Sequence, residues 1–376
     1  MKKTGIIFGK FYPIHMGHVD FIQKASGFVD ELYVVVCSDD TRDKKLFQES
    51  KMRKMPTIKD RLNFVKGIFK YQNNIKLIHL AEDGIPFYPN GWKLWSERVF
   101  EVLLQNDIKV DVIFSNELQD VENYKNNFLT LPNFEKVFNK NLTIQTIDIN
   151  RDNFPISATE VRNSPYHNWD FMPKPVQEFF TIKVAIIGTP HSGKTTLVHK
   201  LSNCYNTNFV EDYKKKYLKK NNLKNLEEKD FNSIAEKYQK KILNSVKSSN
   251  KLVFIDTEFC SLQANLMEFK SKENEIINNF IKNEDFELIF YLESEKKTDK
   301  INIIGGDRSS KIKNSRSIKS SVSEDIETDG IKIPLPRSRQ KSVVRKNDNL
   351  TVRKPQQTEE APKKVVKKKV QKPVVK

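Results

Sequence analysis

Short apolar runs alternate along the chain with longer stretches whose apolar residues recur at helical spacing. The stretches at residues 18–25, 58–70 and 94–105 have this spacing and predict helices. Strands that alternate with helices predict parallel sheets covered by helices, and therefore an α/β fold class. The apolar runs that predict strands lie at residues 4–8, 31–37, 75–80, 110–115, 142–147, 182–187, 251–256 and 286–292.

The alternation pauses once, near the prolines of residues 173–175, and then begins again. We therefore predict two α/β domains, at residues 1–172 and 181–295. Each opens with a strand, a loop that contains glycine, and a helix. This order is typical of nucleotide-binding units, because the loop brings phosphate to the N-terminus of a helix.

Most of the net charge lies in the last part of the chain. Residues 296–376 carry +14 of the formal net charge of +17, and none of the aromatic residues lies there. Such a segment cannot bury enough apolar surface to offset chain entropy. We expect a disordered, basic, low-complexity tail that is simply solvated. Nonspecific, salt-sensitive binding of nucleic acid or another polyanion is the alternative.

Several classes of protein are excluded by the same reading. No apolar run is long enough to span a bilayer. The apolar stretch near the N-terminus is broken by Gly9 and Lys10, so it does not resemble a signal peptide. The three cysteines lie far apart without metal-ligand spacing, and we expect buried or half-buried thiols in a reducing compartment. These features predict a cytoplasmic protein that does not contact a membrane.

The first glycine loop, GKFYPIHMGH at residues 9–18, connects a predicted strand to a predicted helix. Free backbone N–H groups and the helix dipole favour phosphate there. Gly17 allows the backbone to approach a ligand closely. His15 and His18 are three residues apart where the loop enters the helix, so both imidazoles can point at one polyphosphate. The alternative, two surface histidines near a turn, is disfavoured by the preceding strand.

A second polar segment, ISATEVR, occupies residues 156–162. Ser157 and Glu160 have the spacing of a capping box, which alone accounts for a helix start. A helix start that also presents Thr159 and Arg162 is suited to hold a second part of a polyphosphate.

These two segments resemble the GxFxPxHxGH and ISxTxxR motifs of the superfamily of adenylyl- and cytidylyltransferases. The similarity to one bacterial family, the bifunctional nicotinamide-nucleotide adenylyltransferase/ribosylnicotinamide kinases, runs from residue 3 to about residue 292. It implies a Rossmann-like nucleotidyltransferase domain followed by a P-loop kinase-like domain. Some members carry an N-terminal helix-turn-helix repressor domain; this sequence starts at the first strand, so we expect no such role. Four further segments carry the similarity, at residues 38–43, 56–62, 88–96 and 113–117.

The resemblance implies that the phosphate of nicotinamide mononucleotide attacks the α-phosphorus of ATP and that pyrophosphate leaves. The nucleophile is already an anion, so catalysis reduces to alignment and charge stabilisation. Lys10, His15, His18 and Arg162 are the expected catalytic residues that hold the triphosphate, with Mg²⁺ sharing the charge. The other expected ATP- and phosphate-binding positions of this domain are Gly9, Phe11, Gly17, Ser157 and Thr159.

The resemblance also implies a nicotinamide-nucleotide site. Trp92 is expected to stack on the pyridine ring, and Trp95 is expected to belong to the core. Whether the amide or the acid mononucleotide is preferred is left open by the sequence. The remaining expected contacts are Asn90, Asp39 and Arg42, for which, together with Asp60, a solvated charged loop is the alternative.

The segment GTPHSGKT at residues 188–195 fits the phosphate-loop motif GxxxxGK[ST] between a strand and a helix. Lys194 is expected to reach the β- and γ-phosphates, and Thr195 and Asp256 are expected to bind Mg²⁺. Residues 211–213 either contact the riboside or form an exposed acidic turn. The other expected phosphate-binding positions are Gly188, Ser192, Gly193 and Thr196.

Beyond residue 292 the resemblance fails. The family kinase has a Trp-containing lid that ends in Asp-Gly-x-Arg, whereas residues 294–308 contain no Trp and reach Arg308 only after a longer spacing. We therefore expect a weak or lost kinase, because an arginine over the transferred phosphoryl group contributes a large rate factor.

Three hypotheses remain open at this point. The first keeps both activities: the chain uses ATP with nicotinamide mononucleotide and also phosphorylates nicotinamide riboside. The second is an adenylyltransferase with a non-catalytic P-loop domain. The third is a nucleotide-binding protein tethered to a polyanion. Separately from these hypotheses, we expect a homo-oligomer.

Overall fold

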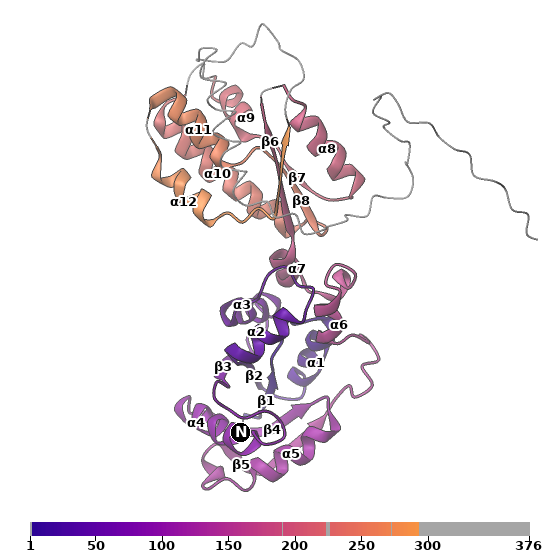
Figure 1. Ribbon diagram of the computed structural model, residues 1–376. Helices are drawn as coiled ribbons and strands as arrows, with labels where there is room; N and C mark the ends of the chain where they lie inside the picture. Colours follow the sequence, from indigo (N-terminus) through magenta and orange to yellow (C-terminus); the bar gives the residue numbers. More distant parts are fainter. Residues whose placement is uncertain (1, 190, 223–225, 272, 293–376) are drawn as a thin grey trace, which may run out of the picture. The chain divides into compact units, whose positions relative to one another are not determined.

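The computed structural model describes residues 2–189, 191–222, 226–271 and 273–292, which contain two separate parallel β-sheets (Figure 1). The expectations for the lid, for Arg308 and for the basic tail concern residues outside these ranges.

The first sheet has the strand order β3-β2-β1-β4-β5, and all its pairs are parallel. The chain builds outward from β1 to β3 and then returns to place β4 on the other side of β1. This reversal makes the carboxyl ends of β1 and β4 a topological switch point, where ligands bind in open α/β sheets. The strands are β1 (Thr4–Gly9), β2 (Glu31–Ser38), β3 (Ile75–Ala81), β4 (Val110–Ser115) and β5 (Phe138–Thr146).

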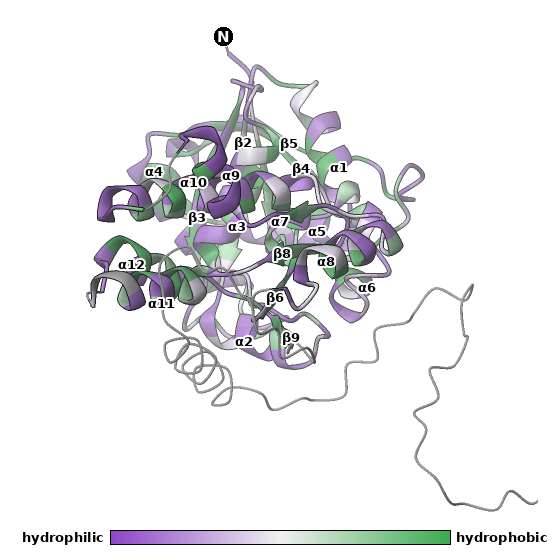
Figure 2. Ribbon diagram, turned by 90° about the horizontal axis from the view of Figure 1, so that it is seen from above, coloured by the Kyte–Doolittle hydropathy of each residue, from purple (hydrophilic) through white to green (hydrophobic). Residues whose placement is uncertain are grey.

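Helices cover both faces of this sheet (Figure 1). In β2, Val34 and Val36 pack with helices α1 (Met16–Ser26) and α3 (Ile58–Ile68). Val35 and Cys37 face the other way and pack with α4 (Trp92–Gln105) and α5 (Leu118–Phe128). The helices carry both hydrophilic and hydrophobic stretches in Figure 2, as expected for elements with one buried side. The other helical segments are α2 (Asp40–Gln48), η1 (Phe134–Lys136), α6 (Ala158–Asn163), η2 (Trp169–Phe171) and α7 (Lys174–Phe180).

The second sheet has the order β7-β8-β6-β9, again with parallel pairs. Val184 and Ile186 of its central strand pack with Val198 of helix α8, while Val253 and Ile255 pack with the opposite helix layer. The strands are β6 (Ile182–Gly188), β7 (Phe209–Val210), β8 (Leu252–Asp256) and β9 (Leu288–Leu292). The helices are α8 (Lys194–Cys204), α9 (Tyr213–Lys220), α10 (Glu228–Lys247), α11 (Phe259–Lys270) and α12 (Glu275–Asn283).

The α/β class and every strand predicted from the sequence are confirmed, although β5 begins four residues earlier than expected. Helix α2 was not predicted, because its sequence DTRDKKLFQ has almost no apolar periodicity; Asp39 caps its N-terminus instead. The expectation for the cysteines is wrong in one case: Cys204 is exposed at the end of α8, while Cys37 is buried and Cys260 is half-buried. Among the described residues, no helix has the length and apolar character needed to cross a membrane.

Candidate active site

A cleft of about 180 Å³ opens beside the carboxyl ends of β1 and β4, at the switch point. The first glycine loop supplies one wall, and the segment between β5 and α6 supplies the opposite wall. The two motif segments, which are far apart in the sequence, therefore line the same cleft. A triphosphate site built from both motifs needs this arrangement. The lining residues are His15, Gly17, His18, Asn116, Asp148, Arg151, Ile156, Ser157 and Ala158.

His15 and His18 stack on each other, with ring centroids 3.8 Å apart and an interplanar angle of 28°. The backbone N–H of His15 donates to Nδ1 of His18 over 3.4 Å. A neutral His18 that accepts at Nδ1 carries its proton on Nε2, which leaves Nε2–H as a donor for a ligand. Gly17 gives the His15 ring room, because a Cβ there would lie 3.1 Å from that ring and the ring would have to shift slightly.

Both imidazoles are held neutral. Burial, together with the nearby Arg151, lowers the pKa of His15 from 6.5 to about 4. Burial and the neighbouring His15 lower the pKa of His18 well below its ordinary value. Each histidine therefore offers a neutral N–H donor at neutral pH.

Phe11, expected to bind ATP, is buried and packs edge-on against His18 with centroids 5.1 Å apart.

Acidification should destabilise this domain through His15. Its pKa is about 4 in the folded chain and near 6.5 when unfolded, so between these values only the unfolded chain binds the proton. The free energy of unfolding should therefore fall as the pH falls from about 6.5 to 4, by up to about 3 kcal/mol from this residue. Denaturant titrations near pH 7 and pH 5 should show a smaller loss in His15→Gln than in the wild type. Equal losses would contradict this assignment.

The ISATEVR segment forms the expected capping box. The Ser157 hydroxyl accepts from the backbone N–H of Glu160 over 3.2 Å, and a Glu160 oxygen accepts from the backbone N–H of Ser157 over 2.8 Å. Arg162 is half-buried and donates to the Tyr12 carbonyl oxygen at 2.8 Å and to the Thr159 hydroxyl at 2.9 Å. Arg162 therefore connects the second motif to the first glycine loop. Of the residues predicted in this segment, only Ser157 lines the cleft.

Three polar cleft residues were not singled out from the sequence: Asn116, Asp148 and Arg151. Asp148 accepts from the Lys24 ammonium at 2.9 Å. Arg151 lies in the loop after β5, and its guanidinium donates to Glu117 at 2.8 Å. Asn116 follows β4 directly. Its position after a strand at the switch point was a usable signal, and it lies within one of the segments that carry the family resemblance. Arg151 had no such signal, because the path of an irregular loop cannot be read from periodicity.

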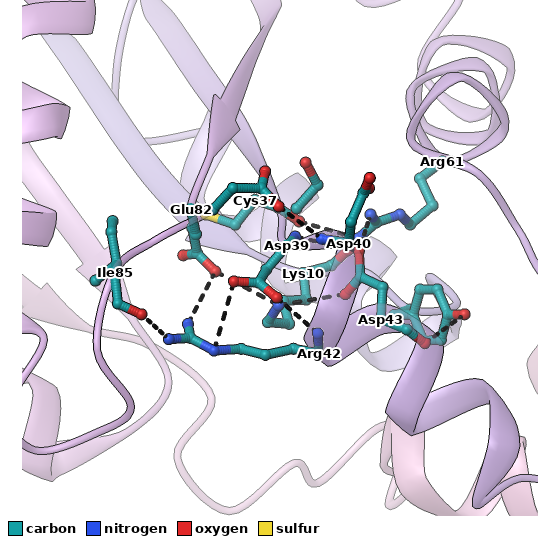
Figure 3. Close-up of polar contacts among 12 residues, drawn as sticks. Lys10, Cys37, Asp39, Asp40, Arg42, Asp43, Arg61, Glu82 and Ile85 are labelled. Atoms are coloured by element: carbon teal, nitrogen blue, oxygen red, sulfur yellow. Dashed lines mark hydrogen bonds and ion pairs between the residues drawn. The ribbon is translucent and has the colours of Figure 1, made fainter.

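Lys10 was expected to hold the triphosphate, but its ammonium lies between two carboxylates (Figure 3). Its Nζ is 3.3 Å from Asp43 and 3.4 Å from Glu82. Glu82 is buried and also accepts from the Trp95 indole at 2.9 Å. A triphosphate role for Lys10 would need an exchange of these partners, so that role stays a prediction.

The same network contains a fully buried arginine that the sequence analysis did not single out. Arg61 is 1% exposed and donates to the carbonyl oxygens of Lys10 and Cys37, both at 2.9 Å. Its second amino group pairs with the Asp43 carboxylate at 2.5 Å. Arg61 therefore ties together the carboxyl ends of β1 and β2, which carry the predicted binding residues.

The two charged residues assigned to the mononucleotide belong to this network as well. Asp39 is 5% exposed and accepts from the backbone N–H of Arg42 at 2.6 Å, so the alternative of a solvated loop is wrong for Asp39. Figure 3 shows the Arg42 guanidinium between the Ile85 carbonyl and the carboxylates of Asp39 and Glu82. Asp60 instead completes the capping box of α3.

The residues expected to bind the nicotinamide ring lie at the start of α4. Asn90 is exposed in the turn before the helix. Trp92 is half-buried, with Trp95 5.3 Å away edge to face, and its indole nitrogen is buried without a hydrogen-bond partner among the described residues. Both tryptophans pack against the same core cluster. The assignment of Trp92 to the ring and of Trp95 to the core stays a prediction.

The second glycine loop follows β6 and requires two of its glycines. Gly188 has φ of 143°, and a Cβ there would lie 2.0 Å from the Leu292 carbonyl oxygen. Gly193 has φ of 88° and precedes α8. Lys194 folds back over the loop and donates to the carbonyl oxygens of Gly188 and Thr189 at 3.0 and 2.8 Å. Within this loop, the Ser192 hydroxyl is buried with no partner among the described residues, whereas Thr196 is exposed.

Two carboxylates lie near this loop. Asp256 ends β8, is 2% exposed and accepts from the Thr195 hydroxyl at 2.6 Å, which brings together the predicted metal ligands. Burial, and to a smaller extent Asp256, raises the pKa of Asp212, which also caps α9 through the Lys214 N–H. Burial lowers the pKa of Lys194, although the nearby carboxylates of Asp256 and Asp212 act to raise it. The site therefore concentrates oxygen donors and one cation where a loop can hold phosphate.

Comparison with known proteins agrees with this arrangement. Residues 6–164 match the cytidylyltransferase-like family, and residues 183–330 match a family of AAA domains. The second match extends beyond residue 295, where the sequence analysis ends the second domain.

Two solved structures have the same fold as the chain. A NadR protein in complex with NR aligns with a TM-score of 0.68 and 23% identity, over 85% of this chain and 86% of that chain. A NadR protein in complex with NAD and AMP-PNP aligns with a TM-score of 0.64 and 23% identity, over 85% of this chain and 88% of that chain.

One curated relative is considerably more similar in sequence. The trifunctional NAD biosynthesis/regulator protein NadR of Escherichia coli K12 is 36% identical over 299 residues, which span 78% of this chain and 70% of the relative. The motifs, the two sheets and this identity agree, and the chain belongs to the NadR family of NAD biosynthesis proteins, with a nucleotidyltransferase domain followed by a kinase-like P-loop domain.

Proposed function

We propose that the first domain makes NAD by transferring the adenylyl group of ATP to nicotinamide mononucleotide. The observation that carries this proposal is the cleft at the β1/β4 switch point, where the two histidines and Ser157 line the same cavity. The phosphate of the mononucleotide attacks the α-phosphorus, the bond to the β-phosphate oxygen breaks, and pyrophosphate leaves. No protein nucleophile is needed, because the attacking group is already an anion.

The protein's own contribution is alignment and hydrogen bonding. His15 and His18 supply neutral N–H donors, and His15 is buried; fixed donors in such a site stabilise developing charge more strongly than water does. Arg151 adds a positive charge at the cleft, and Arg162 fixes the first loop through the Tyr12 carbonyl. We expect the triphosphate to bind along the cleft wall formed by the first glycine loop. We expect the mononucleotide to bind nearer to α4.

We propose that the second domain binds a nucleotide together with magnesium. Magnesium is usually held by one or two carboxylates together with substrate phosphates, and the Thr195 hydroxyl and Asp256 carboxylate, 2.6 Å apart, fit that donor set. Bound there, the ion would neutralise phosphate charge. Lys194 would exchange its loop carbonyls for phosphate oxygens. No larger cluster of His, Cys, Asp and Glu suited to a metal occurs among the described residues.

One experiment tests both domains. The purified full chain is given Mg·ATP with either nicotinamide mononucleotide or nicotinamide riboside, and NAD, ADP and pyrophosphate are separated by chromatography. NAD and pyrophosphate should form in equal amounts from the mononucleotide; their absence would overturn the proposed reaction. ADP formed only with the riboside would identify an active kinase, whereas its absence would support the adenylyltransferase with a non-catalytic P-loop domain.

A further inference from the structure

The turn after strand β8 holds Thr257 in an unusual backbone conformation. Its φ is 77°, a left-handed value at which a β-branched residue is a true outlier. Thr257 directly follows Asp256, the carboxylate assigned above to the nucleotide site of the second domain. Strained residues of this kind persist only where the surrounding contacts hold them, and they cluster at functional sites.

A single tyrosine hydroxyl holds this turn from one side. Tyr238 of α10 is 5% exposed, and its hydroxyl lies 2.7 Å from the Asp256 carbonyl oxygen and 2.9 Å from the Thr257 carbonyl oxygen. One proton is therefore shared by two successive carbonyls. The backbone N–H of Thr257 donates to the Ile186 carbonyl oxygen of β6 at 3.0 Å. The turn is thus fixed between a helix and the central strand.

The side chains on both sides of Thr257 also accept hydrogen bonds. The Asp256 carboxylate accepts from the Thr195 hydroxyl at 2.6 Å. The carboxylate of Glu258 caps α11 and accepts the backbone N–H of Ser261 at 2.7 Å. The Thr257 hydroxyl also donates to the second carboxylate oxygen of Asp256 over 3.4 Å, so the turn at Thr257 contacts this carboxylate directly.

We propose that Tyr238 is a positioning residue for the nucleotide site of the second domain, holding the strained turn at Thr257 so that the Asp256 carboxylate faces Thr195. This inference rests on the proposed function of the P-loop. Without the hydroxyl, the buried carbonyl of Asp256 and the half-buried carbonyl of Thr257 lose this donor, and Thr257 is released toward negative φ. A glycine at position 257 would need no such support, because glycine adopts positive φ without strain.

The test uses the full chain, with Mg·ADP as the probe in calorimetry. The part of the Mg·ADP binding that is lost in the Lys194→Ala variant is assigned to the second domain. Tyr238→Phe should weaken this binding about tenfold and raise the Mg²⁺ concentration that it requires. Thr257→Gly also removes the 3.4 Å contact of the Thr257 hydroxyl with Asp256, so the double variant is compared with Thr257→Gly alone. In this glycine background Tyr238→Phe should cost little affinity, a rescue that a merely structural role of the tyrosine would not produce.

Tyr217→Phe is the matched control. Its hydroxyl donates to Asp230 at 2.8 Å within the same core cluster, so the same substitution removes another buried hydrogen bond, one that does not involve the turn at Thr257. The affinity of this variant for Mg·ADP should stay within about twofold of the wild type. A loss as large as that of Tyr238→Phe would overturn the proposal, because general loosening of the core would then explain both.

The remaining outcomes separate the inference from the proposed function. Wild-type affinity in Tyr238→Phe, or a loss that Thr257→Gly does not relieve, would overturn the positioning role alone. If the wild type shows no Lys194-dependent binding, the nucleotide site fails and the positioning role fails with it. Chemical denaturation without nucleotide gives a second measure: Thr257→Gly should offset the loss of unfolding free energy in Tyr238→Phe, and simple additivity would contradict a turn held by Tyr238.

Discussion

Replacing His18 with alanine should lower kcat for NAD formation about 100- to 1,000-fold, the usual cost of removing one preorganised donor at a site of developing charge. The KM for ATP should change much less, because the lost hydrogen bond matters most in the transition state. The physical basis is the position of His18 in the cleft, with Nδ1 occupied by the His15 backbone and Nε2–H left for the ligand. Steady-state measurement of pyrophosphate release checks the result.

Two further variants sharpen this measurement. His18→Gln keeps an N–H donor near the position of Nε2 and should lose less activity than His18→Ala. His167→Ala is the matched control, because His167 is exposed between α6 and η2; its kcat should stay within about twofold of the wild type. Near-normal turnover in His18→Ala would remove this histidine from the active site.

Replacing Lys194 with alanine should strongly weaken nucleotide binding by the second domain while sparing NAD formation from the mononucleotide. The lysine ammonium is the one charged donor that this loop can turn toward phosphate, and charge-assisted hydrogen bonds are about twice as strong as neutral ones. We expect the affinity for Mg·ADP at this site to fall on the order of 100-fold, together with any riboside phosphorylation. Calorimetry and the chromatographic assay measure the two effects separately.

Lys200→Ala provides the control for Lys194, since Lys200 is exposed on the same helix. It should change neither activity by more than about twofold. If Lys194→Ala instead abolished NAD formation from the mononucleotide, the two domains would not work independently, and the assignment of separate sites would be wrong.

The order of strands and helices was accessible from the sequence because buried parallel strands are almost continuously apolar. The run ELYVVVC became β2, and alternate residues of it pack on opposite helix layers. The histidine loop and the phosphate loop were also recognisable, because their glycines and polar residues occur at spacings that backbone geometry demands. The capping box of Ser157 and Glu160 is the same kind of local signal.

Residues brought together by the tertiary structure were not accessible in this way. Helix α2 is too polar for a periodicity signal, yet its Asp43 is buried against Arg61 and contacts Lys10. Arg151 reaches the cleft from an irregular loop whose path depends on packing. In each case the partner lies more than ten residues away in the chain, where no local pattern extends.

The sequence by itself determined the strands, the two glycine loops and the kinds of chemistry that they can support, because these depend on spacing within a few residues. Only the tertiary structure decided which polar groups share a site. It placed Lys10 between two carboxylates rather than alone in the cleft, and it set Tyr238 against the turn at Thr257. The physical reason is that burial and electrostatic pairing depend on distances between segments, which are set when the sheets and helices pack.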